Sequence, residues 1–199
     1  MELASVACAA FLAVHLAAER RGIPWLRAAG KLAATASFVG LAVSRGPHDR
    51  FGLSVLAALV LSLVGDALLL SARKPAFLAG LVAFLLAHVA YVVSFVPLAR
   101  PSPLVLAAIL AVTAGVVRWL WPHAGELRVP VLAYAVVIAA MLWLALGVPR
   151  VAVQAGAALF WLSDLTVARD RFVRASFANR LVGLPLYYAG QLLLASTVG

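Results

Sequence analysis

Long apolar stretches follow one another along almost the whole chain, separated only by short segments rich in Arg, Pro and Gly. A membrane-spanning helix needs about 20 predominantly apolar residues, and eight stretches reach or approach that length. The chain is 65% hydrophobic and 12% charged, whereas soluble domains are about half apolar and about a quarter charged. The period-2 alternation of a β-barrel is absent. We therefore expect an all-α polytopic bundle, a single integral membrane domain over residues 1–199.

The eight expected helices are joined by short connections that leave no room for a soluble domain. The first stretch is short, but Glu2 and the lack of a basic leader argue against a cleaved signal peptide. The expected helices are Leu3–Ala18, Pro24–Ser44, Phe51–Leu70, Pro75–Leu98, Ser102–Trp121, Val129–Leu146, Val151–Val167 and Leu181–Val198.

The basic residues alternate between the loops. Eleven Lys and Arg residues belong to the first, third, fifth and seventh loops with their flanks, and four belong to the other loops. By the positive-inside rule, the odd loops are cytoplasmic and both termini lie outside. This distribution accounts for the net charge of +9, so nucleic acid is not an expected partner. We expect an integral protein of the bacterial plasma (inner) membrane.

Two aspartates, each preceded by a small residue, stand inside apolar runs: Gly65-Asp66 and Ser163-Asp164. A charge in lipid is unfavourable, so an intramembrane aspartate is a functional candidate by default. Both expected helices run inward, and both carboxyl groups lie roughly 5 Å from the cytoplasmic helix ends. The aspartates are 98 positions apart, which suggests two parallel four-helix halves. We expect them to face one cavity as a pair.

Most other intramembrane polar groups also fall in the cytoplasmic half, which predicts a polar cavity opening inward. Several alternatives stay open. Lys31 either belongs to the site or snorkels to the headgroups. His88 is either a catalytic residue or a core residue with its hydrogen bonds satisfied. Tyr187 is expected to belong to the interfacial aromatic belt. Tyr188 and Gln191 share one helix face, as a cavity stripe or as interhelical contacts. The candidate supporting or substrate-binding residues are Lys31, His88, Tyr134, Ser163, Tyr188 and Gln191.

Familiar catalytic motifs are missing. There is no G-x-S-x-G, H-E-x-x-H, P-loop or G-x-G-x-x-G sequence. Ser163 and Asp164 are adjacent in a helix and point apart, so they are not a nucleophile–base pair. No ligand spacing supports a metal, and we expect no metal and no cofactor. The single cysteine, Cys8, excludes an intrachain disulfide.

The pattern of polar motifs resembles the YhhN-type lysoplasmalogenase family of small eight-helix membrane proteins. The resemblance rests on Lys31, Gly65-Asp66, His88, Tyr134, Ser163-Asp164 with Arg171-Phe172, and Tyr187-Tyr188-Ala189-Gly190-Gln191, and it covers nearly the whole chain. It implies hydrolysis of the vinyl ether bond of lysoplasmalogens to a fatty aldehyde and a glycerophospho-alcohol. It also implies that Asp66 and Asp164 are the catalytic pair and that a lysophospholipid, among membrane lipids, is the substrate.

Two carboxyl groups suit this chemistry. Protonation of the alkene carbon gives an oxocarbenium ion, to which water adds before the hemiacetal collapses. One protonated Asp is able to act as the general acid, and the other, kept ionised by Lys31 or tyrosine hydroxyls, to stabilise the cation and activate water. We expect Asp164 as the acid and Asp66 as the base. The alternatives are a small proton-coupled transporter and a lipid-binding membrane protein without turnover.

Overall fold

The computed structural model describes residues 2–71 and 73–199, which form eight α-helices and no strand. Seven of these helices are long and apolar enough to cross a membrane; α8 is not among the seven. The first helix qualifies, although its sequence suggested a shorter one. The elements are α1 (Glu2–Arg20), α2 (Pro24–Ser44), α3 (Arg50–Leu68), α4 (Lys74–Phe95), α5 (Pro103–Leu120), a 3₁₀ turn η1 (Gly125–Leu127), α6 (Arg128–Gly147), α7 (Val151–Ala168), a π-helical turn η2 (Arg169–Val173) and α8 (Phe177–Ala195).

Residues with known end-capping properties mark several helix starts. Proline stands in the first turn of α2, α4 and α5, where its missing N–H is not needed by the helix. The Asp49 side chain accepts a hydrogen bond from Gly52 N at 2.7 Å and caps α3. The Ser176 hydroxyl accepts from Asn179 N at 3.3 Å, so α8 begins at Phe177, before the expected Leu181.

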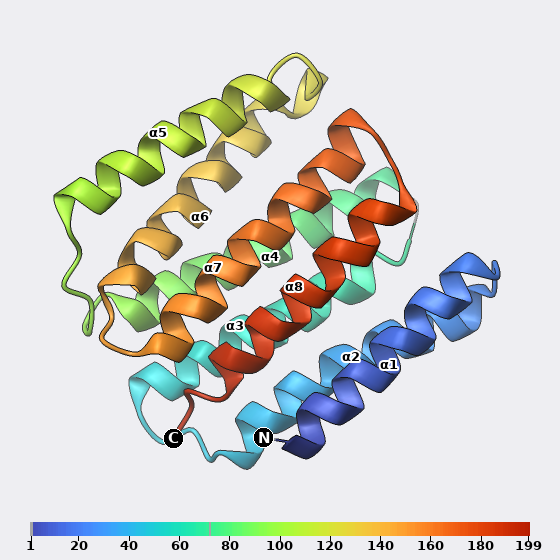
Figure 1. Ribbon diagram of the computed structural model, residues 1–199, viewed down its shortest axis with the longest axis horizontal. Coiled ribbons are helices and arrows are strands. Elements are labelled where there is room, and N and C mark those ends of the chain that lie inside the picture. The colour runs from blue at the N-terminus through green and yellow to red at the C-terminus, as the bar shows by residue number, and fades with distance from the viewer. Residues whose placement is uncertain (1, 72) are drawn as a thin grey trace.

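Successive helices run in opposite directions (Figure 1). Both termini and the connections α2–α3, α4–α5 and α6–α7 lie at one end of the bundle, and the other four connections lie at the opposite end. That opposite end carries the arginine-rich loops, which we call the arginine end. Because α3 and α7 run in the same direction, Asp66 and Asp164 both lie near the arginine end of their helices.

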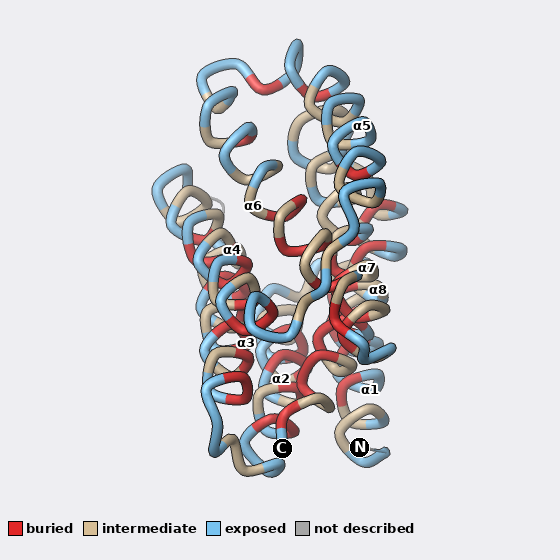
Figure 2. Tube along the Cα trace, turned by 90° about the vertical axis from the view of Figure 1, so that its left-hand side faces the viewer, coloured by how far each residue is buried: buried red, intermediate tan, exposed pale blue. Residues whose placement is uncertain are grey.

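The packed interior lies between the inner faces of α2, α3, α4, α7 and α8, whereas α5 is exposed along most of its length (Figure 2). Phe38, Phe95 and Phe160 are fully buried there. Helices α7 and α8 approach at backbone distance, since a Cβ on Gly190 would lie 2.8 Å from the Gly156 carbonyl oxygen. This contact fixes the spacing between the helices that carry Asp164 and Tyr187.

Candidate active site

A cavity of about 520 Å³ lies at the arginine end, and both aspartates line it. Asp66 comes from α3 and Asp164 from α7, while Lys31, Tyr134 and Tyr187 contribute from α2, α6 and α8. The prediction that the two carboxyl groups face one cavity is therefore confirmed. Much of the remaining lining is apolar and comes from α4, α5 and α6.

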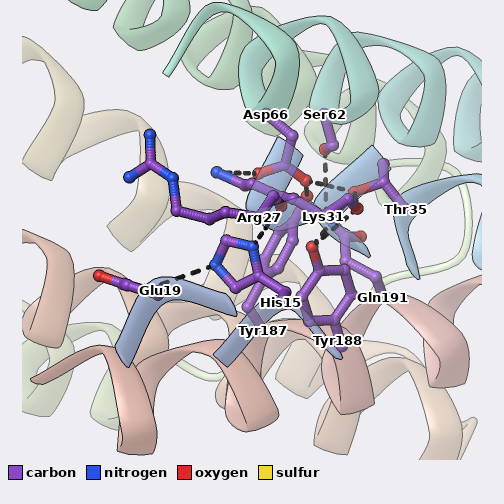
Figure 3. A network of polar contacts seen from close by, with 10 residues as sticks. All are labelled: His15, Glu19, Arg27, Lys31, Thr35, Ser62, Asp66, Tyr187, Tyr188 and Gln191. Atoms are coloured by element: carbon purple, nitrogen blue, oxygen red, sulfur yellow. Dashed lines mark hydrogen bonds and ion pairs between the residues drawn. The ribbon is translucent and has the colours of Figure 1, made fainter. Parts of the chain in front are cut away.

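Asp66 is buried and surrounded by hydrogen-bond donors (Figure 3). Lys31 Nζ lies 3.0 Å from its Oδ1. Thr35 Oγ1 donates to Oδ2 at 2.8 Å, and Tyr187 OH donates to the same oxygen at 2.8 Å. A cation and two hydroxyl donors thus surround the Asp66 carboxyl group. Lys31 therefore lines the cavity beside Asp66 and does not snorkel to the headgroups.

Tyr187 corrects a sequence-based expectation. It is 6% exposed and bonds to Asp66, so it does not belong to an interfacial aromatic belt. The reason is packing: its ring lies edge-on to Phe38, Phe84 and Phe160, which enclose it inside the bundle and leave its hydroxyl pointing at α3.

Behind Asp66, a second layer of polar contacts joins α2, α3, α4 and α8. Tyr188 OH lies 3.3 Å from Thr35 Oγ1 and 3.3 Å from the Lys31 carbonyl oxygen. Gln191 Nε2 donates to Ser62 Oγ at 3.0 Å, and Tyr91 OH donates to Gln191 Oε1 at 2.6 Å. Tyr188 and Gln191 are absent from the cavity lining. They make interhelical contacts and do not form a stripe facing the cavity.

Asp164 has a different environment. Tyr134 OH donates to its Oδ2 at 2.9 Å, and His88 Nε2 lies 3.5 Å from the same oxygen. Within the described part of the chain, no Lys or Arg lies within ion-pair distance of Asp164, and its Oδ1 accepts no hydrogen bond. The side chain is 17% exposed, against 3% for Asp66. Asp164 is thus the more accessible carboxyl group and the one without a fixed cation.

His88 is held in one tautomer. Its Nδ1 lies 2.7 Å from the Phe84 carbonyl oxygen, which only accepts, so we assign the proton of the neutral ring to Nδ1. Nε2 then carries a lone pair, faces Asp164 and has no hydrogen-bond partner among the residues that the structure describes. His88 Nε2 and Asp164 Oδ2 are then two acceptor atoms 3.5 Å apart, so a proton on either atom would lie between them. The ring packs against Phe160 and Tyr134.

The small residues before the two aspartates have structural roles. A Cβ on Gly65 would lie 2.6 Å from the Phe84 ring, so glycine lets α4 approach α3 beside Asp66. Ser163 lines the cavity, but its hydroxyl donates to the Phe160 carbonyl oxygen at 2.7 Å, within its own helix. Among the described residues, no group of three or more His, Cys, Asp or Glu side chains is placed to hold a metal ion.

The two aspartates have matching neighbours in the two halves of the chain. Each Oδ2 accepts from a hydroxyl on the second helix of its own half, Thr35 for Asp66 and Tyr134 for Asp164. Each also meets a side chain from the fourth helix of the other half, Tyr187 for Asp66 and His88 for Asp164. The corresponding positions lie at nearly the same sequence offset as the aspartates themselves. These contacts agree with the suggested pair of parallel halves.

Sequence reasoning did not identify Thr35 as a site residue. A threonine inside a helix commonly bonds its own preceding turn, and Thr35 Oγ1 does lie 3.1 Å from the Lys31 carbonyl oxygen. The available signal was its position one turn after Lys31, on the same helix face.

The fold and the site together define an α-helical integral membrane protein with two carboxyl groups around one cavity. The chain belongs to the YhhN family, whose model matches residues 26–198. It is similar to the lysoplasmalogenase of Mycobacterium bovis, with 36% identity over 156 residues, which cover 71% of this chain and 59% of that protein. The chain thus spans less than two thirds of the length of this mycobacterial relative.

Two further relatives cover more of their own length. Lysoplasmalogenase TMEM86B of Homo sapiens is 34% identical over 172 residues, 86% of this chain and 75% of that protein. The uncharacterized membrane protein YhhN of Escherichia coli O157:H7 is 28% identical over 206 residues, 98% of this chain and 96% of that protein. No solved structure matches the chain.

Proposed function

We propose that this protein is a membrane-embedded hydrolase that cleaves the vinyl ether bond of lysoplasmalogens to a fatty aldehyde and a glycerophospho-alcohol. The observation that carries the proposal is the single cavity lined by two carboxyl groups in unlike settings. Relatives named lysoplasmalogenase support the substrate class.

Asp164 is the proposed general acid. Within residues 2–71 and 73–199, no Lys or Arg pairs with it and its Oδ1 accepts no hydrogen bond, and His88 Nε2 faces it as an acceptor. A neutral carboxyl group in this position is able to deliver its proton to the alkene carbon of a bound vinyl ether. The product of that step is an oxocarbenium ion and the Asp164 carboxylate.

Asp66 has contacts that support a different role from the base expected from sequence. Three donors already occupy its oxygens, out of about four acceptor positions in a carboxylate. We propose that the Asp66 carboxylate stabilises the oxocarbenium ion electrostatically, because its hydrogen-bond donors hold it in place before the reaction begins. Lys31, Thr35 and Tyr187 are its positioning residues.

The second half of the reaction returns a proton to Asp164. Water adds to the oxocarbenium carbon and its proton returns to the Asp164 carboxylate, which restores the acid. In the resulting hemiacetal the bond from carbon to the glycerol oxygen breaks, and the hydroxyl proton passes to that oxygen, which gives the aldehyde and the alcohol. In the net reaction, one vinyl ether and one water give one aldehyde and one alcohol, and neither aspartate has gained or lost a proton.

The cavity also suits a single-chain amphiphile. Its polar groups gather at Asp66 and Asp164, while Leu81, Leu120 and Ile138 give it an apolar wall able to contact an alkenyl chain. By the positive-inside rule, the arginine end faces the cytoplasm, so we propose that the cavity opens on the cytoplasmic side of a bacterial plasma membrane.

The test compares a lysoplasmalogen with its alkyl ether analogue, each incubated with the purified protein, and measures aldehyde. We expect release from the vinyl ether alone. Aldehyde from neither lipid, together with uptake of the lipid into proteoliposomes, would contradict the proposal and support a transporter. Binding without release or uptake would support a lipid-binding protein.

A further inference from the structure

The charged side chains that line the cavity do not all pair with one another. Three are basic, Lys31, Arg171 and Arg180, and three are acidic, Asp66, Asp164 and Asp170. Lys31 pairs with Asp66, and Arg180 NH1 lies 2.9 Å from Asp170 Oδ2. Two groups remain without an oppositely charged Lys, Arg or carboxylate partner within the described chain: Asp164 and Arg171.

Arg171 lies on η2, where the chain leaves α7 at the arginine end. Its guanidinium group sits over the Phe77 ring of α4, 3.9 Å from the ring centroid. This cation–π contact fixes the position of the guanidinium but leaves its charge available. The side chain is exposed and also lines the cavity, so its position is at the cavity mouth.

The neighbouring acid does not neutralise Arg171. Asp170 accepts hydrogen bonds from Ser176 N at 2.8 Å and from Asn179 Nδ2 at 3.0 Å, besides its ion pair with Arg180. Arg180 in turn also contacts Glu19 of α1. Asp170 therefore ties η2 to the start of α8, and its charge is compensated within that connection.

We propose that Arg171 binds the phosphate of an amphiphile whose reactive bond lies at Asp164. The proposal rests on the proposed function for the identity of the reactive bond, but not for the phosphate. A guanidinium group is suited to bidentate contact with phosphate. Arg171 comes seven positions after Asp164 along α7 and η2, roughly 10 Å along the helix axis. An extended glycerol backbone with its phosphoester and ether oxygens is of comparable length.

The experiment measures binding and does not depend on turnover. An alkyl ether lysophospholipid, which has no vinyl ether to cleave, is titrated onto the protein in uncharged detergent, and an alkylglycerol with the same chain serves as the phosphate-free ligand. Arg171→Gln should weaken binding of the phosphate-bearing ligand roughly ten- to hundredfold and leave the alkylglycerol unchanged. Arg171→Lys should recover part of the loss.

Arg174→Gln is the matched control, because Arg174 is exposed near Arg171 but does not line the cavity. An equal loss in Arg171→Gln and Arg174→Gln would overturn the proposal and indicate general attraction of headgroups. An equal loss for both ligands, or none for either, would overturn it as well. Inorganic phosphate is titrated as a competitor: if it binds as tightly as the amphiphile, the site belongs to the free anion and the lipid assignment fails.

These outcomes separate the two proposals. Phosphate-dependent binding through Arg171 without any aldehyde release from a lysoplasmalogen would refute the hydrolase and keep the phosphate site. Aldehyde release with binding that does not depend on Arg171 would keep the hydrolase and refute the phosphate site.

Discussion

Lys31 of α2 and Asp66 of α3 form an ion pair, with Nζ 3.0 Å from Oδ1 and side chains that are 11% and 3% exposed. Two charges in such a place are stable only as a pair, because neither has enough water to solvate it alone. The pair therefore couples the packing of two helices to the charge of one proposed site residue.

Replacing Lys31 by Met should destabilise the protein by about 3–5 kcal/mol, the usual effect of leaving one buried charge unpaired. The double variant Lys31→Met/Asp66→Asn should recover most of that stability, since the unpaired charge is gone, but not the activity. Unfolding in detergent, followed by tryptophan fluorescence, checks both. A double variant no more stable than Lys31→Met would contradict a buried charge pair.

Asp164→Asn should reduce aldehyde release by at least about 10²–10⁴-fold, the usual contribution of a general acid, without loss of folded protein. The amide keeps the shape of the side chain but has no acidic proton to deliver. Ser163→Ala is the control at the preceding position, since that hydroxyl donates to the Phe160 carbonyl oxygen of its own helix, and it should retain most activity. Full activity in Asp164→Asn would exclude Asp164 as the acid.

Tyr187→Phe should lower kcat roughly ten- to hundredfold, with a smaller effect from Tyr188→Phe. Both changes remove one buried hydroxyl, but only Tyr187 donates directly to Asp66, whereas Tyr188 contacts Thr35 and the backbone of Lys31. Loss of a hydrogen bond to a charged group is worth about 1.5–3 kcal/mol. Steady-state rates of aldehyde release compare the two; the opposite order would assign the main donor role to Tyr188.

Gly65→Ala should destabilise the protein by about 1–3 kcal/mol, because the added methyl group overpacks the interface with the Phe84 ring. Activity should fall as well, since Phe84 also supplies the carbonyl that orients His88. Gly40→Ala is the matched control on α2, where a Cβ would meet nothing within 4 Å. Unfolding curves of the two variants give the comparison, and similar curves would show that the ring moves aside freely.

Hydrolysis in deuterated water should place one deuterium on the α-carbon of the fatty aldehyde, the carbon bonded to the carbonyl carbon. The proposed first step delivers a solvent-exchangeable proton from Asp164 to that carbon. Mass spectrometry of the aldehyde, trapped at once by reduction, measures the label. An unlabelled aldehyde would mean that the ether bond breaks without protonation at carbon.

The helices could be predicted well because their signals are local. The bounds of α2 agree with expectation, since Pro24 and the following apolar run define it. Helix α8 begins earlier than its sequence predicts, because Asn179 and Arg180 are polar residues of the kind that are common in loops. In the structure Asn179 is buried and bonded to Asp170 and to the Arg174 carbonyl oxygen.

The candidate site was predictable in part for a different reason. Asp66 and Asp164 stand out because charge is rare in an apolar chain, and the helix directions place them at one end. Thr35 and Tyr187 carry no such signal, because a hydroxyl or a tyrosine is common in membrane helices. Their roles depend on which helices become neighbours, and only the packing of α2 and α8 against α3 determines that.

The crossed contacts of the two aspartates have a consequence for how the chain can be divided. Asp66 takes one donor from α8, and Asp164 faces His88 of α4, so neither four-helix half contains a complete set of partners. A break in the α4–α5 connection, which lies at the end opposite the cavity, would separate the halves without touching a site residue. Each fragment alone should then be inactive, and insertion of both fragments into one membrane should restore activity, because the site forms only where the two halves pack together.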